Sequence, residues 1–408
     1  MDRRTVLRGL GGAIGLTSLR LGGIARAAEA PLSAGLPGGV FDTAVMEALP
    51  GKRPLIRLTT RPPNYETPAS YFADAITPND AFFVRYHLAQ IPRVNPATWR
   101  LDVGGEGAAA PFSLTLNELE TGFEQVELAA VCQCSGNRRG FSNPHVPGVQ
   151  WGSGAMGNAV WRGPRLKDVL ARAQLRTEVV EIVFDGADTA PLTGTPDFVK
   201  SIPAAKAQDD NTIIALRMNG EPLPHYHGFP ARLVVPGWTA TYWMKHLVSI
   251  QAITRPYDGF WMRGAYRIPN NMFPVVQRFL SQETAANTPI TEMVVNSVIA
   301  SPNEGQRFRT GERVDVRGVA WDGGYGIARV EVSADAGMSW REATLGPDLG
   351  RFAFRSFSNA SAAFATPGTR RVMAKATNRI GQTQVDTLIF NAPGYHNNVM
   401  RPTTVTIG

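Results

Sequence analysis

The sequence has 408 residues, of which 43% are hydrophobic, and it contains only two cysteines. A chain of this length can bury two hydrophobic cores without disulfide bonds, so we expect two domains rather than a small disulfide-stabilised scaffold. The formal net charge of +7 comes partly from the first residues, and no cluster of Lys and Arg interleaved with aromatic residues follows them. This distribution argues against a nucleic-acid-binding protein.

Residues 1–27 have the pattern of a twin-arginine signal peptide. The pair Arg3-Arg4 precedes a weakly apolar stretch, residues 10–24, and Ala27 ends a small-residue cleavage site. The apolar stretch is short and is interrupted by Arg20, which disfavours a permanent membrane anchor. We therefore expect export of the folded protein to the periplasm, removal of the signal and no membrane attachment afterwards.

Residues 28–80 are punctuated by proline and glycine, which predicts an N-terminal arm on the surface rather than regular structure. The following run, Ala81–Leu88, favours a strand. Residues two apart in a strand share a face, so Arg85 and His87 project together. A cation beside an imidazole suits an anionic ligand, although two surface polar residues would give the same pattern.

The next predicted elements lead to the two cysteines. Residues 99–105 and 112–119 favour a strand pair entering a short helix, and the apolar run Leu128–Val131 favours a buried strand. That strand delivers Cys132 and Cys134 to a turn rich in Ser, Gly and Asn.

Two arginines, Arg138 and Arg139, follow this turn. Nearby positive charge lowers the pKa of a thiol, and the thiolate binds soft metals. Paired guanidinium groups also bind small oxyanions. Two other interpretations are possible: a buried free cysteine is often only a small hydrophobic residue, and paired arginines often lie on a solvated face. A Cys132–Cys134 disulfide is disfavoured because the two side chains would project in parallel.

Many glycines and prolines lie between Gly140 and Gly163, which predicts an irregular loop covering the site. A helix is expected at 164–173 and strands at 179–184 and 212–218, with Asp188 in a turn after the first strand. Two histidines further on, at positions 225 and 227, suggest zinc by their spacing. No cluster of Cys, Asp or Glu completes such a site.

Several motifs, taken together and in order, resemble the sulfite oxidase family. The turn Cys134–Arg139 resembles its molybdenum-binding cysteine loop, and the resemblance extends over residues 50–408. The other matching segments are Phe83-Val84-Arg85-Tyr86-His87, Trp151-Gly152, Ala159–Gly163, His227–Arg232, Val235-Pro236-Gly237 and Lys245.

The resemblance implies roles for individual residues. It assigns Cys134 as the molybdenum ligand and Arg85, Arg139, Tyr266 and Trp151 to the substrate pocket. The residues that it implies as cofactor-binding are Phe83, Val84, Arg85, Tyr86, His87, Asp188, His227, Arg232, Trp243, Met244 and Lys245.

Further roles implied by the resemblance concern Arg138 and His87, which would support the site or contact the pterin phosphate. Tyr242 stands where the animal enzymes carry arginine, so we expect that polar contact to be lost.

The implied fold is α+β and strand-rich. A sulfite oxidase-type molybdopterin domain at 81–285 precedes an immunoglobulin-like β-sandwich at 286–408, which resembles the family's dimerisation domain. Alternation and frequent turns between 293 and 391 independently predict about seven short strands there.

The implied function is molybdenum-molybdopterin-dependent oxidation of sulfite to sulfate. The sequence has no Cys-x-x-Cys-His motif, so we expect no haem on this chain and a c-type cytochrome as electron acceptor. We expect a homodimer or a complex with a haem subunit. A sulfane dehydrogenase, a methionine-sulfoxide reductase of the same fold and a non-enzymatic immunoglobulin-type binding module are the alternatives.

Overall fold

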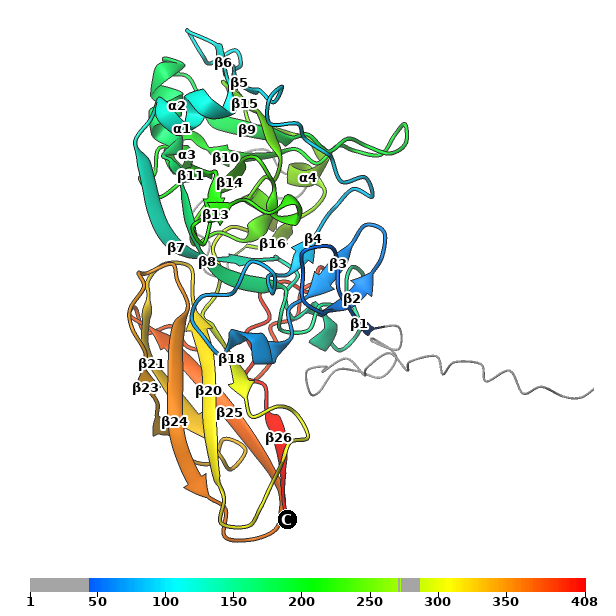
Figure 1. The fold of residues 1–408 in the computed structure, drawn as a ribbon, viewed down its shortest axis with the longest axis vertical. Helices are drawn as coiled ribbons and strands as arrows, with labels where there is room; N and C mark the ends of the chain where they lie inside the picture. The colour runs from blue at the N-terminus through cyan, green and yellow to red at the C-terminus, as the bar shows by residue number, and fades with distance from the viewer. Residues whose placement is uncertain (1–43, 271, 273–286) are drawn as a thin grey trace, which may run out of the picture.

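The computed structural model describes residues 44–270, 272 and 287–408. These residues form an upper, mixed domain, a lower β-sandwich and a small N-terminal sheet beside them (Figure 1). The predicted signal peptide and the predicted boundary at 285/286 lie outside the described residues. Within these ranges, no helix is long and apolar enough to cross a membrane.

The N-terminal segment contains regular structure, which corrects the expectation of an irregular arm. Its strands pair antiparallel in the order β1-β2-β3-β4, and a 3-10 helix, η1, follows β3. The described prolines that suggested irregularity, at positions 50, 54, 62, 63 and 68, lie outside the strands. The run at 81–88 supplies only a two-residue strand, β4. The bounds are β1 Val45–Glu47, β2 Leu55–Thr59, β3 Asn64–Glu66, η1 Ala69–Phe72 and β4 Val84–Arg85.

The upper domain is built on two larger sheets. One has the order β10-β9-β15-β5-β6 and the other β13-β12-β8-β7. The predicted strand pair and short helix are confirmed as β5, β6 and α1, and α1 begins with a capping box between Thr115 and Glu118. The bounds are β5 Leu101–Gly104, β6 Phe112–Leu114, β7 Gln125–Gln133, β8 Met156–Pro164, β9 Glu181–Gly186, β10 Lys200–Pro203, β12 Arg217–Met218, β13 Glu221–Pro222 and β15 Leu247–Ile253.

Short elements surround these sheets. Strand β11 pairs with β14, and β16 pairs with β17. The predicted helix at 164–173 is confirmed as α2. The bounds are α1 Leu116–Thr121, α2 Leu166–Arg172, α3 Ala204–Ala207, α4 Phe260–Arg263, η2 Arg139–Phe141, η3 His225–His227, η4 Ala240–Tyr242, β11 Ile213–Ala215, β14 Arg232–Val234, β16 Arg267–Pro269 and β17 Asn287–Pro289.

Strand β8 contradicts the prediction of an irregular loop up to Gly163. It pairs with β7 along all nine residues. Its glycines allow close packing: a Cβ on Gly157 would lie 2.5 Å from the ring of Phe82, and one on Gly163 would lie 1.9 Å from the carbonyl oxygen of Ile214. Glycine inside a strand commonly marks such a close approach, so these glycines do not indicate a turn.

The lower domain is a two-layer β-sandwich, as predicted. Its sheets have the orders β18-β20-β24-β23 and β19-β26-β25-β21-β22. Buried Val316 of one sheet and Val330 and Ala374 of the other share one core. The described residues after 293 form nine strands, more than the seven expected, because short edge strands are also present. The bounds are β18 Asn296–Ser301, β19 Arg307–Phe308, β20 Arg313–Trp321, β21 Ile327–Ser333, β22 Arg341–Glu342, β23 Thr344–Leu345, β24 Arg355–Ala363, β25 Gly368–Asn378 and β26 Thr403–Ile407.

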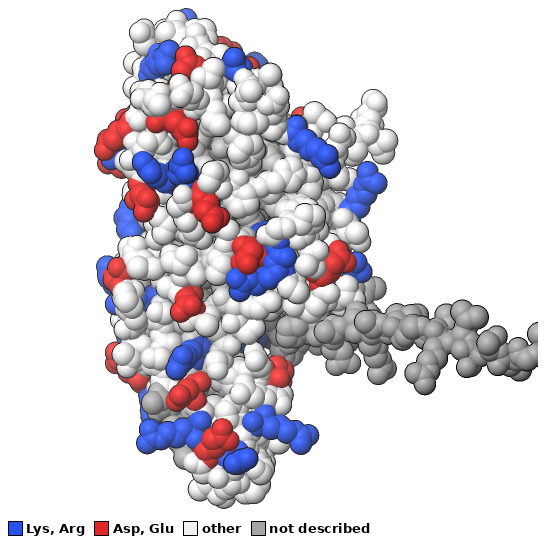
Figure 2. Space-filling view, viewed as in Figure 1, with Lys and Arg blue, Asp and Glu red and all other residues white. Residues whose placement is uncertain are grey.

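The end of β7 joins the two domains. Val131 donates its backbone N–H to the carbonyl oxygen of Phe352 at 2.9 Å, and the indole of Trp321 donates to the side chain of Gln133 at 2.6 Å. The cysteine turn therefore starts at the domain junction. On the face drawn in Figure 2, positive and negative side chains are interspersed and do not gather into one patch of a single sign.

Candidate active site

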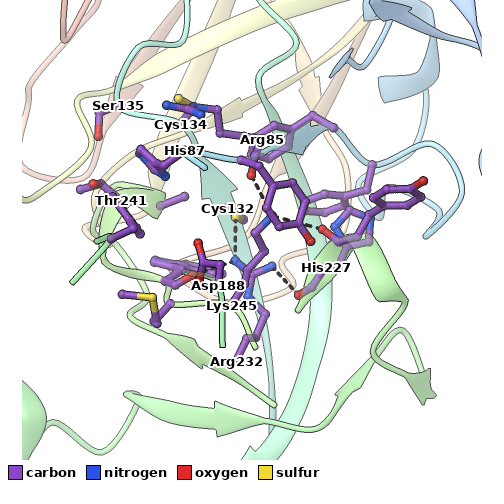
Figure 3. A pocket seen from close by; sticks show the side chains of 18 of the residues that line it. Arg85, His87, Cys132, Cys134, Ser135, Asp188, His227, Arg232, Thr241 and Lys245 are labelled. Carbon is purple, nitrogen blue, oxygen red and sulfur yellow. Dashed lines mark hydrogen bonds between the residues drawn. The ribbon is translucent and has the colours of Figure 1, made fainter. Parts of the chain in front are cut away.

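A pocket in the upper domain brings together most of the predicted site residues (Figure 3). Its walls come from the segment around β4, the end of β7, η3, the start of β14 and the segment after η4. The predicted residues that line it are Phe83, Arg85, Tyr86, His87, Cys134, Asp188, His227, Arg232, Trp243, Met244, Lys245 and Tyr266.

Cys134 lies on a tight turn at the end of β7. Its backbone N–H donates to the carbonyl oxygen of Ala155 at 2.9 Å, and its own carbonyl accepts from Asn137 N–H at 2.9 Å. The side-chain oxygen of Asn137 accepts from Ala155 N–H at 3.0 Å. These bonds fix the turn, so the thiol has a defined position in the pocket wall.

Cys132 also lines the pocket, and both cysteines are free thiols. The guanidinium of Arg232 lies 3.8 Å from the Cys132 sulfur. Burial raises the pKa of Cys132, although Arg232 and Lys245 oppose this shift. The buried thiol therefore stays protonated near neutral pH.

His87 and Tyr266 are in direct contact through Nε2 and the phenol oxygen. The His87 ring stacks on Phe198 at 3.5 Å between centroids. Burial, with the charge of Arg85 as the next cause, holds the pKa of His87 well below its usual range, so the imidazole is neutral. Burial also raises the pKa of Tyr266, while Arg85 and Arg139 lower it. Tyr266 therefore remains a phenol that can donate a hydrogen bond.

The backbone of Tyr266 is unusual. Its φ is 58°, in the left-handed region that non-glycine residues seldom occupy, and its carbonyl oxygen accepts from Ile290 N–H at 2.8 Å. Such backbone conformations persist where the surrounding structure holds them, and they concentrate at functional sites.

Basic side chains form the opposite part of the pocket. Lys245 donates to the carbonyl oxygen of Arg85 at 2.7 Å and lies 3.1 Å from the centroid of the Tyr86 ring. Arg232 donates to the carbonyl oxygens of His227 at 3.2 Å and Trp243 at 3.3 Å. Burial lowers the pKa of both basic groups.

Asp188 is the acidic residue of the lining, and burial raises its pKa to about 6, with Lys245 opposing the shift. The pocket thus combines three basic side chains, Arg85, Arg232 and Lys245, with one carboxyl group.

Within the part of the chain that the structure describes, Nε of Arg232 and Oγ1 of Thr241 are buried without a hydrogen-bond partner. Buried polar atoms in native proteins normally have partners, so these atoms suit a bound polar group. A molybdopterin, with its anionic phosphate and many acceptor atoms, fits this donor set, and Cys134 offers a soft ligand for its metal.

Arg139 does not line the pocket, contrary to its predicted place there. Its Nε donates to the carbonyl oxygen of Pro393 at 2.8 Å, and its guanidinium lies 5.2 Å from the centroid of the Tyr395 ring. Gly136 makes room for it, because a Cβ there would lie 2.5 Å from Nη1. Arg139 acts on the pocket from behind, through its charge on Tyr266.

Three other expected residues also lie outside the lining. Trp151 is fully buried and meets Phe83 edge-on, with centroids 6.4 Å apart, so it supports the wall from behind. Val84 packs in the core of the N-terminal sheet. Arg138 has a φ of 70°, which turns its buried guanidinium towards Asn296 of the lower domain. Burial lowers its pKa to about 9. Arg138 thus joins the two domains and is not part of the pocket.

Tyr242, where the resemblance implied the loss of a polar contact, is buried outside the lining. The ammonium of Lys200 lies 4.7 Å from the centroid of its ring. Sequence reasoning missed several lining residues, including Phe198 and Thr241. It also missed Tyr395, whose sequence context carries no signal that it stacks on Tyr266.

Comparisons with known proteins agree with this geometry. The family model of the oxidoreductase molybdopterin binding domain matches residues 87–261, and that of the Mo-co oxidoreductase dimerisation domain matches residues 287–406. Mitochondrial sulfite oxidase of Rattus norvegicus is 38% identical over 307 residues, which are 72% of this chain and 54% of that protein. Sulfite oxidase of Gallus gallus is 34% identical and covers 72% of this chain and 65% of that protein.

More distant similarities extend the comparison. An NADH nitrate reductase of Hordeum vulgare is 32% identical over 84% of this chain and 40% of that protein. The solved structure of the sulfane dehydrogenase SoxCD from Paracoccus pantotrophus has a TM-score of 0.72 and 24% identity, covering 84% of each chain. At that identity the likeness concerns the fold alone. The chain spans about half the length of the mitochondrial relatives that it matches.

The fold and the pocket are those of the molybdopterin-binding oxidoreductases. The chain belongs to the sulfite oxidase family, as the resemblance of its motifs implied.

Proposed function

We propose that this chain oxidises sulfite to sulfate. The observation that carries the proposal is the cluster of Arg85, His87 and Tyr266, which lines the same pocket as Cys134. A guanidinium and a phenol are donors that suit a small oxyanion. A neutral sulfoxide has less need of a guanidinium, so the cluster disfavours a methionine-sulfoxide reductase.

The side chains contribute binding and orientation in this proposal. The molybdenum cofactor, held through Cys134 and the basic residues Arg232 and Lys245, would supply the two-electron redox chemistry. Arg85 would bind a substrate oxygen, and Tyr266 would donate a hydrogen bond to another. Neutral His87, in contact with the phenol oxygen, would donate its Nε2–H to that oxygen and hold Tyr266 in place, so that the phenol proton stays available for the substrate.

We also propose periplasmic location, a c-type cytochrome as electron acceptor, and either a homodimer or a complex with a haem subunit. The match of residues 287–406 to a dimerisation domain supports the homodimer. Light scattering of the purified protein at micromolar concentration is expected to give twice the mass of one mature chain. A monomer mass would argue against the dimer.

The test of function is a substrate comparison with the molybdenum-loaded protein. Reduction of cytochrome c should depend on sulfite. A protein-bound sulfane donor, the substrate of one alternative activity, should not reduce cytochrome c, and methionine sulfoxide, the substrate of the other, should not oxidise an added electron donor. Turnover of either one without sulfite oxidation would replace the sulfite proposal.

A further inference from the structure

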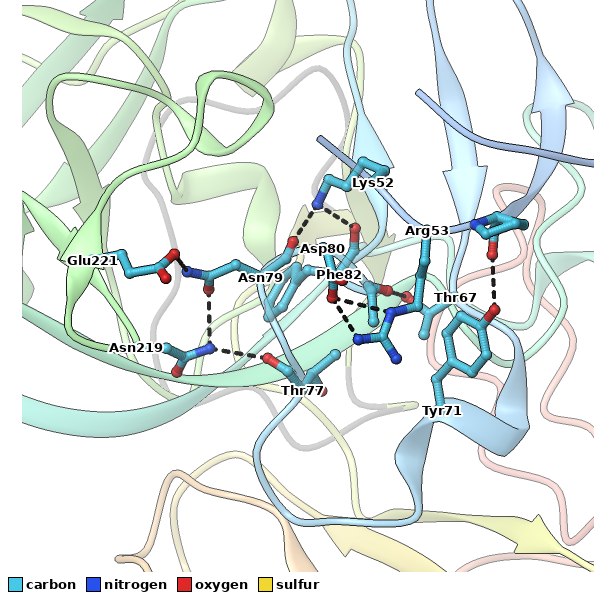
Figure 4. Close-up of polar contacts among 12 residues, drawn as sticks. Lys52, Arg53, Thr67, Tyr71, Thr77, Asn79, Asp80, Phe82, Asn219 and Glu221 are labelled. Atoms are coloured by element: carbon cyan, nitrogen blue, oxygen red, sulfur yellow. Dashed lines mark hydrogen bonds and ion pairs between the residues drawn. The ribbon is translucent and has the colours of Figure 1, made fainter. Parts of the chain in front are cut away.

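Lys52, a residue of the N-terminal segment, reaches the back of the cofactor pocket. It lies between β1 and β2, and only 8% of it is exposed. Its Nζ donates to the carbonyl oxygens of Asn79 at 2.5 Å and Phe82 at 3.0 Å (Figure 4), and it contacts Nε2 of His227. An ammonium group has three N–H donors and no acceptor, so these three contacts use its whole hydrogen-bonding capacity.

The contact with Lys52 determines which nitrogen of His227 carries the proton. Because an ammonium can only donate, Nε2 must offer its lone pair. Burial, followed by the charges of Lys52, Arg232 and Lys245, holds the pKa of His227 well below its usual range, and a hydrogen bond with the backbone of Asn79 is the smallest influence and opposes the shift. The ring is therefore neutral, and its single proton must be on Nδ1. His227 lines the pocket, and in this tautomer Nδ1 is the ring nitrogen that can donate a hydrogen bond to a bound group.

Lys52 also connects two walls of the pocket. Phe82 leads into the wall that carries Arg85, whereas His227 belongs to η3. The rings of Phe82 and His227 meet edge-on, with centroids 5.2 Å apart. One ammonium group therefore bonds to the backbone of the first wall and to the imidazole of the second.

The neighbouring Arg53 fixes the same turn without contacting the pocket. Its backbone N–H donates to the carbonyl oxygen of Asp80 at 3.1 Å, and its guanidinium pairs with the Asp80 carboxylate at 2.8 Å, which Figure 4 also shows. Asn79 is held separately by the carbonyl oxygen of Met218 and the carboxylate of Glu221, each at 3.0 Å. Because these contacts already fix the turn and its partner segment, the bond from Lys52 to His227 has a separate role.

We propose that Lys52 is a positioning residue of the cofactor pocket, which holds His227 as the Nδ1-protonated tautomer so that the ring donates a hydrogen bond to an acceptor atom of the cofactor. This inference rests on the pocket binding molybdopterin and not on sulfite being the substrate. Burial lowers the pKa of Lys52 to about 7, with Asp80 opposing the shift. The test is therefore made at about pH 6, where the ammonium form prevails.

The first measurement is the nitrogen NMR spectrum of the histidine side chains in the molybdenum-loaded protein, with His227→Gln used to assign the signal. The wild-type spectrum should show a protonated Nδ1 and an unprotonated, hydrogen-bonded Nε2. In Lys52→Met the Nε2 signal should lose its hydrogen-bonded character, and the ring should populate both tautomers. A protonated Nε2 in the wild type would overturn the proposal, and this result needs no variant of Lys52 to fold.

The second measurement is the rate at which the purified protein loses its pterin on dialysis. Removal of a charge-assisted hydrogen bond from the pocket should make this loss about tenfold faster in Lys52→Met. Arg53→Met is the matched control, since it removes a cation from the same turn but no contact to His227, and it should behave like the wild type. Equal losses in the two variants, or unchanged retention in Lys52→Met, would contradict the proposal. Neither measurement needs turnover, so the proposal for Lys52 can be supported or contradicted even if the protein does not oxidise sulfite.

Discussion

The rings of Tyr266 and Tyr395 stack with their centroids 5.8 Å apart and their planes 4° from parallel. Tyr266 belongs to the pocket wall, whereas Tyr395 comes from the segment that follows the long strand β25 of the sandwich. Arg139 lies over the Tyr395 ring. The C-terminal part of the chain therefore holds Tyr266 from behind, and Arg139 in turn lies against that support.

Replacing Tyr395 by Leu should weaken sulfite oxidation without removing any pocket side chain. An aromatic pair contributes about 0.5–1.5 kcal/mol beyond burial, which corresponds to a loss of roughly two- to tenfold in kcat/KM. Tyr395→Phe keeps the ring and should stay within about twofold of the wild type. The value of kcat/KM for sulfite is measured by steady-state kinetics of both variants at equal molybdenum content. Equal kinetics for Leu and Phe would show that the stack does not matter.

The two cysteines should respond differently to substitution by serine. Cys134→Ser should abolish turnover and metal binding, because a neutral hydroxyl is a poor ligand for a soft metal. Cys132→Ser should keep most of the activity, since that buried thiol lies beside Arg232 and is not the predicted ligand. Elemental analysis and sulfite turnover are the measurements. Loss of molybdenum in the Cys132 variant, with activity kept in the Cys134 variant, would reverse the ligand assignment.

Arg85 and Arg139 should differ in their effect on substrate binding. A charge-assisted hydrogen bond contributes roughly 1.5–3 kcal/mol, so Arg85→Gln should raise KM for sulfite by about one to two orders of magnitude. Arg139→Gln should raise KM less, because the guanidinium bonds to Pro393 and lies outside the pocket lining. Arg85→Lys should restore binding only in part, since an ammonium lacks the planar fork.

The kinetics are compared at several salt concentrations and at full metal content. Wild-type constants in both glutamine variants would remove the main physical support for an oxyanion substrate.

Glu66 should make stability depend on pH. Its buried carboxyl accepts N–H bonds from Gly152 at 2.7 Å and Gly154 at 2.8 Å. Glu66 thereby holds a loop whose next residue, Ala155, accepts the backbone N–H of Cys134 with its carbonyl oxygen. Burial raises the pKa of Glu66 from 4.5 to about 7. The folded state therefore binds this proton more tightly than the unfolded state does, and the stabilisation is complete below about pH 4.5 and is lost as the pH rises through about 7.

This shift corresponds to roughly 3 kcal/mol of unfolding free energy between the two limits. Denaturant titrations at about pH 5 and about pH 8 should show that the wild type loses more stability with rising pH than Glu66→Gln, which cannot ionise. Parallel pH dependence in the two proteins would mean that Glu66 titrates as it does in the unfolded chain.

The cysteine turn was predictable because its signal is local. An apolar run before Cys132 and a Ser-Gly-Asn turn after Cys134 are enough to place a strand end there, and β7 confirms it. The adjacent arginines show the limit of local patterns. Arg138 and Arg139 were expected in one site, but the left-handed backbone of Arg138 sends the two guanidinium groups to Asn296 and to the Tyr395 ring.

The contacts that the sequence did not reveal join distant residues. Lys52 and His227 are 175 positions apart, and no periodicity or turn motif relates them. Strand β8 was missed for a different reason. Glycine at positions 157 and 163 was interpreted as a turn signal, whereas the requirement there is for space against Phe82 and Ile214.

The bond from Arg139 to the carbonyl oxygen of Pro393 spans 254 positions of the chain. During synthesis, a ribosome must therefore add the sandwich strands β18 to β25 and the segment up to Pro393 after the cysteine turn before this bond can form. The pocket cannot reach its final form on a nascent chain that still lacks Pro393 and Tyr395. Loading of the cofactor into a finished pocket must consequently follow translation of this segment, and a ribosome stalled in β25 would carry a cysteine turn without its rear support.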